Sequence, residues 1–177
     1  MTDANSTQLA VIGAGPGGYA AAFLAADLGM DVTLIDPAPN PGGVCLYRGC
    51  IPSKALLHVA KLLTEAKEAE RWGIEFGEPK IDIAKLRSFK QGVVDKLTGG
   101  LGQLNERRGV KYLQGRASFR DATSLEVKLT DGGEQVLGFE HAIVATGSVP
   151  ITIPLLPSGS SRVLDSTSAL ELEEVPP

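Results

Sequence analysis

The chain opens with short apolar runs on either side of an alanine-rich stretch, the pattern of a strand–helix–strand unit. Four consecutive apolar residues at 9–12 predict a buried strand, and a second apolar run at 31–35 predicts another. Between them, residues 19–28 have helical character, and Gly29 is placed to end the helix. We therefore expect a parallel βαβ unit at the start of the fold.

Two longer helices are expected in the middle of the chain. Apolar residues recur at three- and four-residue steps over 53–72, and Gly73 can end that helix. The same periodicity runs over 83–105, where we expect Gly99 and Gly100 to interrupt the helix. We expect this second helix to serve packing alone.

Strand patterns return after the second helix. Residues 110–113 predict a strand that enters Gly115, while strands at 125–129 and 135–139 flank a Thr-Asp-Gly-Gly-Glu turn that is typical of a hairpin. A separate apolar strand over 141–148 ends in a small-residue turn. Such a turn, at the carboxyl edge of an open α/β sheet, can approach a ligand.

These patterns predict an α/β fold: a Rossmann-like βαβ domain with a parallel sheet and a small antiparallel hairpin or meander insert. We expect one domain over 1–150 that includes a cysteine-bearing helix over 45–72. Residues 151–177 are expected to be a linker, because they are rich in Pro, Ser and Gly before a short helix-like segment at 168–174.

The loop after the first strand fits the G-x-G-x-x-G pattern of dinucleotide-binding proteins. Gly13 allows a tight turn, Gly15 lets the backbone approach a pyrophosphate, and Gly18 lets the helix pack close to the strand. The N-terminus of the helix offers unpaired N–H groups to phosphate. Asp36, at the end of the second strand, can accept hydrogen bonds from ribose hydroxyls, or it can be a solvated strand end. The loop itself does not distinguish NAD from FAD.

Both cysteines of the chain lie in one short segment, as Cys45-x4-Cys50. A disulfide between them needs an irregular turn, because residues five apart in a regular helix are about 7.5 Å apart along its axis. Gly49 and Pro52 make such a turn possible. A bridge closing so small a loop adds little stability, which favours a reactive bond. The alternatives are two reduced core cysteines, or half of a zinc site with His58, to which we give no catalytic role.

Composition narrows the classes of function. The chain has 177 residues, is 43% hydrophobic and carries a net charge of −4, which suits a globular domain and argues against a nucleic-acid surface. No apolar run approaches the roughly 18 residues that a membrane span requires, and the polar first eight residues do not resemble a signal peptide. We therefore expect a cytoplasmic protein without a membrane partner, in which a disulfide is more often catalytic than structural.

Taken together, four segments closely resemble the flavin-dependent pyridine nucleotide–disulfide oxidoreductases, and within them the N-terminal part of the lipoamide dehydrogenase branch. The segments are Val11 to Tyr19, Gly42 to His58, Ala145 to Gly147, and Asp165 to Thr167. The chain departs from the family in two places. Aspartate stands at Asp36 where glutamate is usual, and Tyr47-Arg48 replaces a more usual Asn-Val-like pair.

The resemblance implies a redox relay that uses FAD and NAD and no metal. Dihydrolipoamide would attack the disulfide at Cys45, Cys50 would become the thiolate stacked on the flavin, and Lys54 would stabilise negative charge near the isoalloxazine. From sequence alone, Lys54 could equally be a surface lysine at a helix start. The residues implied to contact the cofactor are Gly13, Gly15, Pro16, Gly17, Gly18, Asp36, Pro37, Gly42, Gly43, Val44, Cys45, Cys50, Lys54, Gly115, Ala145, Thr146 and Gly147.

The resemblance also implies partners: dihydrolipoamide on the lipoyl domain of an acyltransferase in a 2-oxo acid dehydrogenase complex, and a second copy in a homodimer. Family members are several hundred residues long, so we expect this chain to lack the NAD-binding domain, the dimer interface and the histidine–glutamate base pair. Full activity is not expected from this chain alone. Two other readings stay open: a sibling reductase for glutathione or mercuric ion, and a nucleotide-binding module without turnover.

Overall fold

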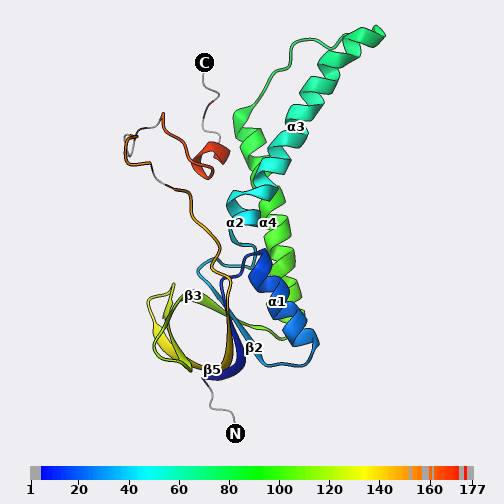
Figure 1. Cartoon of the computed structure of the whole chain (residues 1–177). Coiled ribbons are helices and arrows are strands. Elements are labelled where there is room, and N and C mark those ends of the chain that lie inside the picture. The colour runs from blue at the N-terminus through cyan, green and yellow to red at the C-terminus, as the bar shows by residue number, and fades with distance from the viewer. Residues whose placement is uncertain (1–4, 152, 157–159, 161, 172–173, 175–177) are drawn as a thin grey trace. The chain divides into compact units, whose positions relative to one another are not determined.

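The computed structural model describes residues 5–151, 153–156, 160, 162–171 and 174 (Figure 1). They pack as two compact units, the first drawn from 1–45 and 97–148 and the second from 46–96 and 149–177. The domain boundary expected at residue 150 stays a prediction. The strands are β1 (Ser6–Ile12), β2 (Val32–Asp36), β3 (Lys111–Phe119), β4 (Ser124–Leu129) and β5 (Glu134–Val144). The helices are α1 (Pro16–Asp27), α2 (Gly43–Arg48), α3 (Cys50–Glu68) and α4 (Ile83–Arg107), with 3₁₀ turns η1 (Ala69–Trp72) and η2 (Ser168–Leu170).

The five strands belong to the first unit and combine parallel and antiparallel pairing. β1 lies parallel to β2 and β5, and β2 lies parallel to β3, which confirms the predicted βαβ unit. β4 is antiparallel to β3 and β5, as predicted for the hairpin insert. The α/β class is therefore confirmed. An open sheet was expected, however, and the strands instead close into a ring, which Figure 1 shows beside α1.

The ring closes because two strands are longer than their sequence patterns indicate. β3 pairs with β2 over its first residues and with β4 from Gly115 onward. The prediction of two separate strands at 135–139 and 141–148 is wrong, because β5 is one strand that passes from β4 to β1 at Gly138. That glycine is opposite both Ser124 and Ser6. Because Gly138 has no side chain, the sequence at this position does not indicate that β5 changes its pairing partner there.

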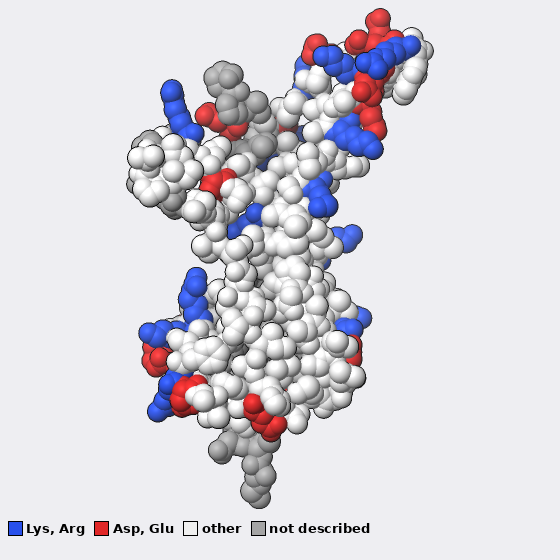
Figure 2. Space-filling view, viewed as in Figure 1, with Lys and Arg blue, Asp and Glu red and all other residues white. Residues whose placement is uncertain are grey.

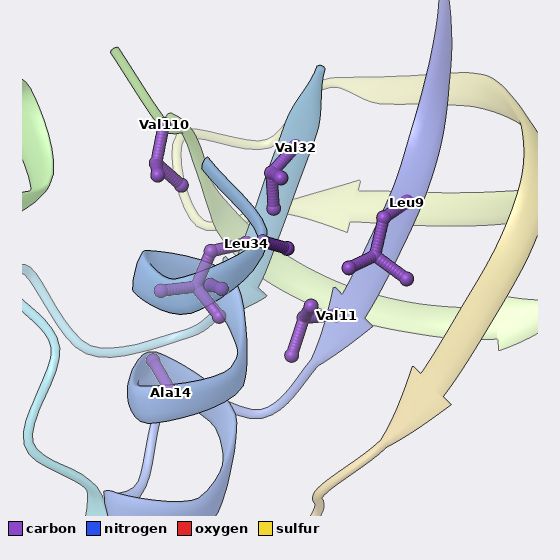
Figure 3. Packing of buried hydrophobic residues seen from close by; sticks show 8 residues of the cluster. Leu9, Val11, Ala14, Val32, Leu34 and Val110 are labelled. Carbon is purple, nitrogen blue, oxygen red and sulfur yellow. The ribbon is translucent and has the colours of Figure 1, made fainter. Parts of the chain in front are cut away.

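Strand alternation divides the first unit into two hydrophobic cores. Leu9 and Val11 point from β1 toward α1, where Val32, Leu34 and other side chains join them (Figure 3). Their neighbours on β1 face the other way and pack with side chains of the hairpin. This second core contains Ala10, Ile12, Ile35, Leu125, Val127 and Leu137. Two faces of the same sheet are thus covered, one by helix α1 and the other by the hairpin.

In the second unit, the helix predicted over 53–72 is confirmed as α3 followed by η1. It ends at Gly73, whose φ of 80° is the left-handed conformation that favours glycine. The expected interruption at Gly99 and Gly100 is wrong: α4 is continuous from Ile83 to Arg107. Each glycine costs about 1 kcal/mol relative to alanine in a helix. The burial of Val94 and of other α4 side chains in tertiary contacts outweighs that cost.

The segment expected to be a linker has local structure of its own. The Asp165 carboxylate accepts hydrogen bonds from the backbone of Thr167 and Ser168, which starts η2. The buried ammonium of Lys90 donates to the Leu170 carbonyl at 2.8 Å. The predicted helical segment at 168–174 is a 3₁₀ turn over 168–170, and part of it lies outside the described residues. Among the described helices, none combines the length and apolar character needed to cross a membrane.

Candidate functional site

The predicted glycine loop, acidic residue and small-residue turn lie at one edge of the sheet. β1, β2 and β5 run parallel, so their carboxyl ends meet there. The loop from Gly13 follows β1, Asp36 is the last residue of β2, and the turn that begins at Ala145 follows β5. The Ala145 N–H donates to the Ile12 carbonyl at 2.8 Å, which holds the turn against the start of the loop. The three strands that form this edge are parallel, and ligands of parallel α/β sheets bind outside the carboxyl ends of their strands.

Two loop glycines are required by contacts within the protein. A Cβ on Gly13 would overlap the Ala145 carbonyl oxygen, and its φ of 98° is a conformation that favours glycine. A Cβ on Gly18 would overlap the Gly13 carbonyl oxygen and lie 3.5 Å from the Ala145 side chain. The roles predicted for these two residues, a tight turn and close helix–strand packing, fit this geometry.

Two other loop glycines have no such reason. A Cβ on Gly15 would meet only the Gly43 Cα, at 3.9 Å, and a Cβ on Gly17 would meet nothing within 4 Å. Gly15 has φ −70° and ψ −178°, which any residue adopts. It is the N-cap of α1, and Pro16 follows at the first helical position. The open surface at Gly15 and Gly17 therefore leaves the helix N-terminus accessible, with its N–H groups and positive dipole end facing any bound anion.

Asp36 is hydrogen-bonded to the backbone at both carboxylate oxygens. Its Oδ2 accepts from the Ala14 N–H at 2.8 Å, and its Oδ1 accepts from the Ala38 N–H at 2.9 Å. The carboxylate is thus half-buried and bound to the backbone of its own protein, and its role toward ribose stays a prediction. Neither of these hydrogen-bond partners was predicted from the sequence. The aspartate in place of glutamate was the one available indication, because a shorter side chain stays closer to its own loop.

The segment that leads to the first cysteine packs against the glycine loop. The Gly42 N–H donates to the Ala14 carbonyl at 2.8 Å. Gly43 has φ 58°, and a Cβ there would lie 2.5 Å from the Gly15 Cα. Gly43, Val44 and Cys45 then form the first half of α2, where the Cys45 side chain is half-buried. The structure thus brings these predicted residues together with the loop in the first unit.

Cys50 and Lys54 belong to the second unit, at the start of α3. The chain breaks its helical course between the cysteines, because Gly49 has φ −143° and ψ −109°. A disulfide between the two cysteines would need an irregular turn of this kind. Both side chains, the Cys50 thiol and the Lys54 ammonium, are exposed, and no disulfide joins Cys50 to Cys45 in this structure. Pro52 is buried in the first turn of α3, where its missing N–H costs no helical hydrogen bond.

The remaining predicted residues flank the end of β2. Pro37 follows Asp36, and its carbonyl accepts a hydrogen bond from the Gln114 side chain at 3.2 Å. Gly115 is the next residue of β3, and a Cβ there would lie 2.5 Å from the Lys128 carbonyl oxygen. Glycine at this position is therefore explained by the approach of β4. Any contact of Gly115 with a cofactor stays a prediction.

Charges and potential metal ligands give no other site. In the part of the chain that the structure describes, no three His, Cys, Asp or Glu side chains are grouped to hold a metal ion. On the face shown in Figure 2, Lys and Arg are interspersed with Asp and Glu. In the first unit, the candidate site therefore consists mainly of backbone groups of the loop together with the Asp36 carboxylate and the Cys45 thiol.

Comparison with known proteins identifies relatives over almost the whole chain. A family model described as pyridine nucleotide-disulphide oxidoreductase matches residues 7–176. A dihydrolipoyl dehydrogenase of Vibrio cholerae is 50% identical over 178 residues, which is 99% of this chain and 37% of the relative. One from Haemophilus influenzae is 47% identical over 176 residues, with the same two shares. One from Halobacterium salinarum is 46% identical, over 96% of this chain and 36% of the relative. The chain thus spans little more than a third of the length of these relatives.

Proposed function

Because the chain belongs to the pyridine nucleotide-disulphide oxidoreductase family, we propose that it binds FAD at its glycine loop and carries the redox-active cysteines of a dihydrolipoyl dehydrogenase. The observation that carries the proposal is the open backbone at Gly15 and Gly17, where no contact within the described chain requires glycine. We expect a pyrophosphate to bind at this open backbone, called the cradle below, because the N-terminus of α1 offers it N–H donors and the positive end of a helix dipole.

The proposed FAD site contains more than the cradle. We assign to it the residues that the sequence predicts, namely Gly13, Gly15, Pro16, Gly17, Gly18, Asp36, Pro37, Gly42, Gly43, Val44, Cys45, Cys50, Lys54, Gly115, Ala145, Thr146 and Gly147. The shared edge of the sheet supports the members that lie in the first unit, because the loop, Asp36 and the turn after β5 meet there. Cys50 and Lys54 lie in the second unit and are assigned from the family resemblance alone. Bound FAD would supply the acceptor for an electron pair, and NAD+ would be the final acceptor.

The protein's own chemistry in this proposal is thiol–disulfide exchange. With Cys45 and Cys50 joined in the oxidised protein, one thiolate of dihydrolipoamide attacks the Cys45 sulfur and Cys50 leaves as a thiolate. The second substrate thiolate then attacks the mixed disulfide at the substrate sulfur, which closes the lipoamide ring and releases the Cys45 thiolate. The substrate dithiol is oxidised, the protein disulfide is reduced, and the two thiol protons pass to solvent or a base. Lys54 would stabilise nearby negative charge by its ammonium group.

The biological setting is proposed from the names of the relatives. We expect the substrate to be dihydrolipoamide on the lipoyl domain of an acyltransferase, within a 2-oxo acid dehydrogenase complex, and the whole enzyme to be a homodimer. The relatives' shared name favours this substrate over glutathione or mercuric ion. A cytoplasmic location stays a prediction.

Equilibrium binding of flavins to the purified chain tests the proposal. FAD is titrated with the protein and followed by the quenching of flavin fluorescence, with riboflavin as the comparator because it lacks the pyrophosphate and the adenosine. We expect FAD to bind and riboflavin to bind at least tenfold more weakly, since the loop contacts are assigned to the missing part. Equal binding of both flavins, or no binding of FAD, would contradict the proposed site.

A further inference from the structure

Ala14 connects three parts of the first unit: the glycine loop, the end of β2 and the segment that precedes α2. Its N–H donates to Asp36 Oδ2 at 2.8 Å, and its carbonyl accepts from the Gly42 N–H at 2.8 Å. Its side chain is fully buried beside α1 and the strands (Figure 3). The backbone on either side of this residue is therefore held from two directions, by the end of β2 and by the segment that enters α2.

The contacts with the glycine loop extend along the chain toward Cys45. Gly42 immediately precedes α2, and Gly43 packs so closely on Gly15 that a Cβ would lie 2.5 Å from its Cα. Cys45 is the third residue of this six-residue helix. So short a helix has little stability of its own, because helices of fewer than about 12 residues are marginal in isolation. The position of the Cys45 thiol therefore depends on how firmly the start of α2 is attached to the glycine loop.

We propose that Asp36 is a positioning residue for Cys45. The carboxylate is itself fixed, since its other oxygen accepts from the Ala38 N–H at 2.9 Å. It holds Ala14 by a charge-assisted hydrogen bond, and Ala14 in turn holds Gly42 and the start of α2. A carboxylate has about four acceptor positions, so this role leaves room for a ribose hydroxyl. The redox role of Cys45 rests on the proposed function. The structural link from Asp36 through Ala14 to the start of α2 does not.

The link is tested on the whole reduced chain without flavin, by measuring the alkylation rates of the two thiols with iodoacetamide and peptide mass spectrometry. Cys50 is the internal control, because it lies in the other unit. Asp36→Ala should raise the rate at Cys45 about tenfold, the effect expected when a hydrogen bond to a charged group is lost and α2 opens more often. The rate at Cys50 should change less than twofold.

Asp31→Ala is the matched control variant. Asp31 immediately precedes β2, and its carboxylate pairs with the Lys111 ammonium at 3.0 Å, so its removal also deletes a charge next to this strand. This variant should leave both alkylation rates within twofold of the wild type. An equal rise at both thiols in Asp36→Ala, or no rise at either, would overturn the proposal, because it would show general loosening or no link.

A second measurement covers the case in which Asp36→Ala does not fold. Hydrogen exchange of the wild-type chain should show the Ala14 and Gly42 amides protected at least tenfold more than the Gly17 amide, which lies in the open first turn of α1. Equal exchange at the three amides would overturn the link. Since neither assay contains flavin, a failure of FAD binding would leave these results unchanged, and the two proposals fail separately.

Discussion

Replacing Gly15 by alanine should leave the fold intact and weaken flavin binding. The added methyl group would meet only the Gly43 Cα at 3.9 Å, an ordinary contact, and the backbone angles of Gly15 suit alanine. An alanine N-cap costs roughly 0.5–1 kcal/mol relative to glycine, and a more restricted unfolded chain returns about 0.4–1 kcal/mol. We therefore expect the free energy of unfolding of Gly15→Ala to stay within about 0.5 kcal/mol of the wild type.

The effect on FAD should be much larger. A methyl group on Gly15 would project into the space assigned to the pyrophosphate, and forcing an extra carbon into a packed site costs about 1–3 kcal/mol. Because 1.4 kcal/mol is tenfold in Kd, the affinity for FAD should fall roughly 5- to 150-fold. Urea unfolding followed by circular dichroism measures the stability, and quenching of flavin fluorescence measures the affinity.

Gly18→Ala is the matched comparison within the same loop. A Cβ there would overlap the Gly13 carbonyl oxygen, so the loop and α1 would have to separate, at a cost of roughly 3 kcal/mol or more of folding stability. The reasoning would be refuted if Gly15→Ala bound FAD as tightly as the wild type. It would also be refuted if Gly18→Ala proved as stable as Gly15→Ala.

Two further predictions concern polar groups of the first unit. Thr33→Val should raise the free energy of unfolding by about 1 kcal/mol, because the buried Thr33 hydroxyl has no hydrogen-bond partner among the residues that the structure describes. Thr7→Val should lower the free energy of unfolding by about 1 kcal/mol, because the Thr7 hydroxyl donates to the Asp31 carbonyl. Urea unfolding of both variants measures the two changes. Hydrogen bonds from the Ser124 hydroxyl and the Thr123 backbone N–H lower the pKa of Asp121 below its usual 3.8. Its contribution to stability is therefore complete above the unfolded pKa and is lost as the pH falls through the lower folded pKa, so the stability difference between wild type and Asp121→Asn should shrink over that acid range and not above it.

The sequence alone predicted the structure correctly where a local backbone geometry can be adopted by only one residue type. The tight turn at Gly13 and the close packing at Gly18 were predicted from sequence, because a positive φ or a close backbone approach leaves few alternatives to glycine. The sequence did not predict the structure correctly where contacts between residues far apart in the chain determine it. The helix α4 passes through Gly99 and Gly100 because tertiary packing outweighs a local preference, which no pattern within those residues records.

Long-range geometry also explains what was missed at the strands and at the candidate site. β5 changes partner at Gly138, and only the closure of the ring makes one strand of two apparent ones. Asp36 was recognised as the acidic residue at the end of β2, yet its hydrogen bond with Ala14 depends on how a loop 22 residues earlier is folded. The sequence therefore indicates which residues carry suitable chemical groups, and the fold determines which partners those groups bind.

Anaerobic addition of one equivalent of dihydrolipoamide to the oxidised, FAD-loaded chain, followed by visible absorption, tests the central claim most directly. The account predicts a new long-wavelength absorption band from a thiolate beside the flavin, present in the wild type and absent in Cys50→Ser. A flavin spectrum that does not respond to the dithiol, or a band that survives in Cys50→Ser, would contradict the claim that these two cysteines are the redox centre.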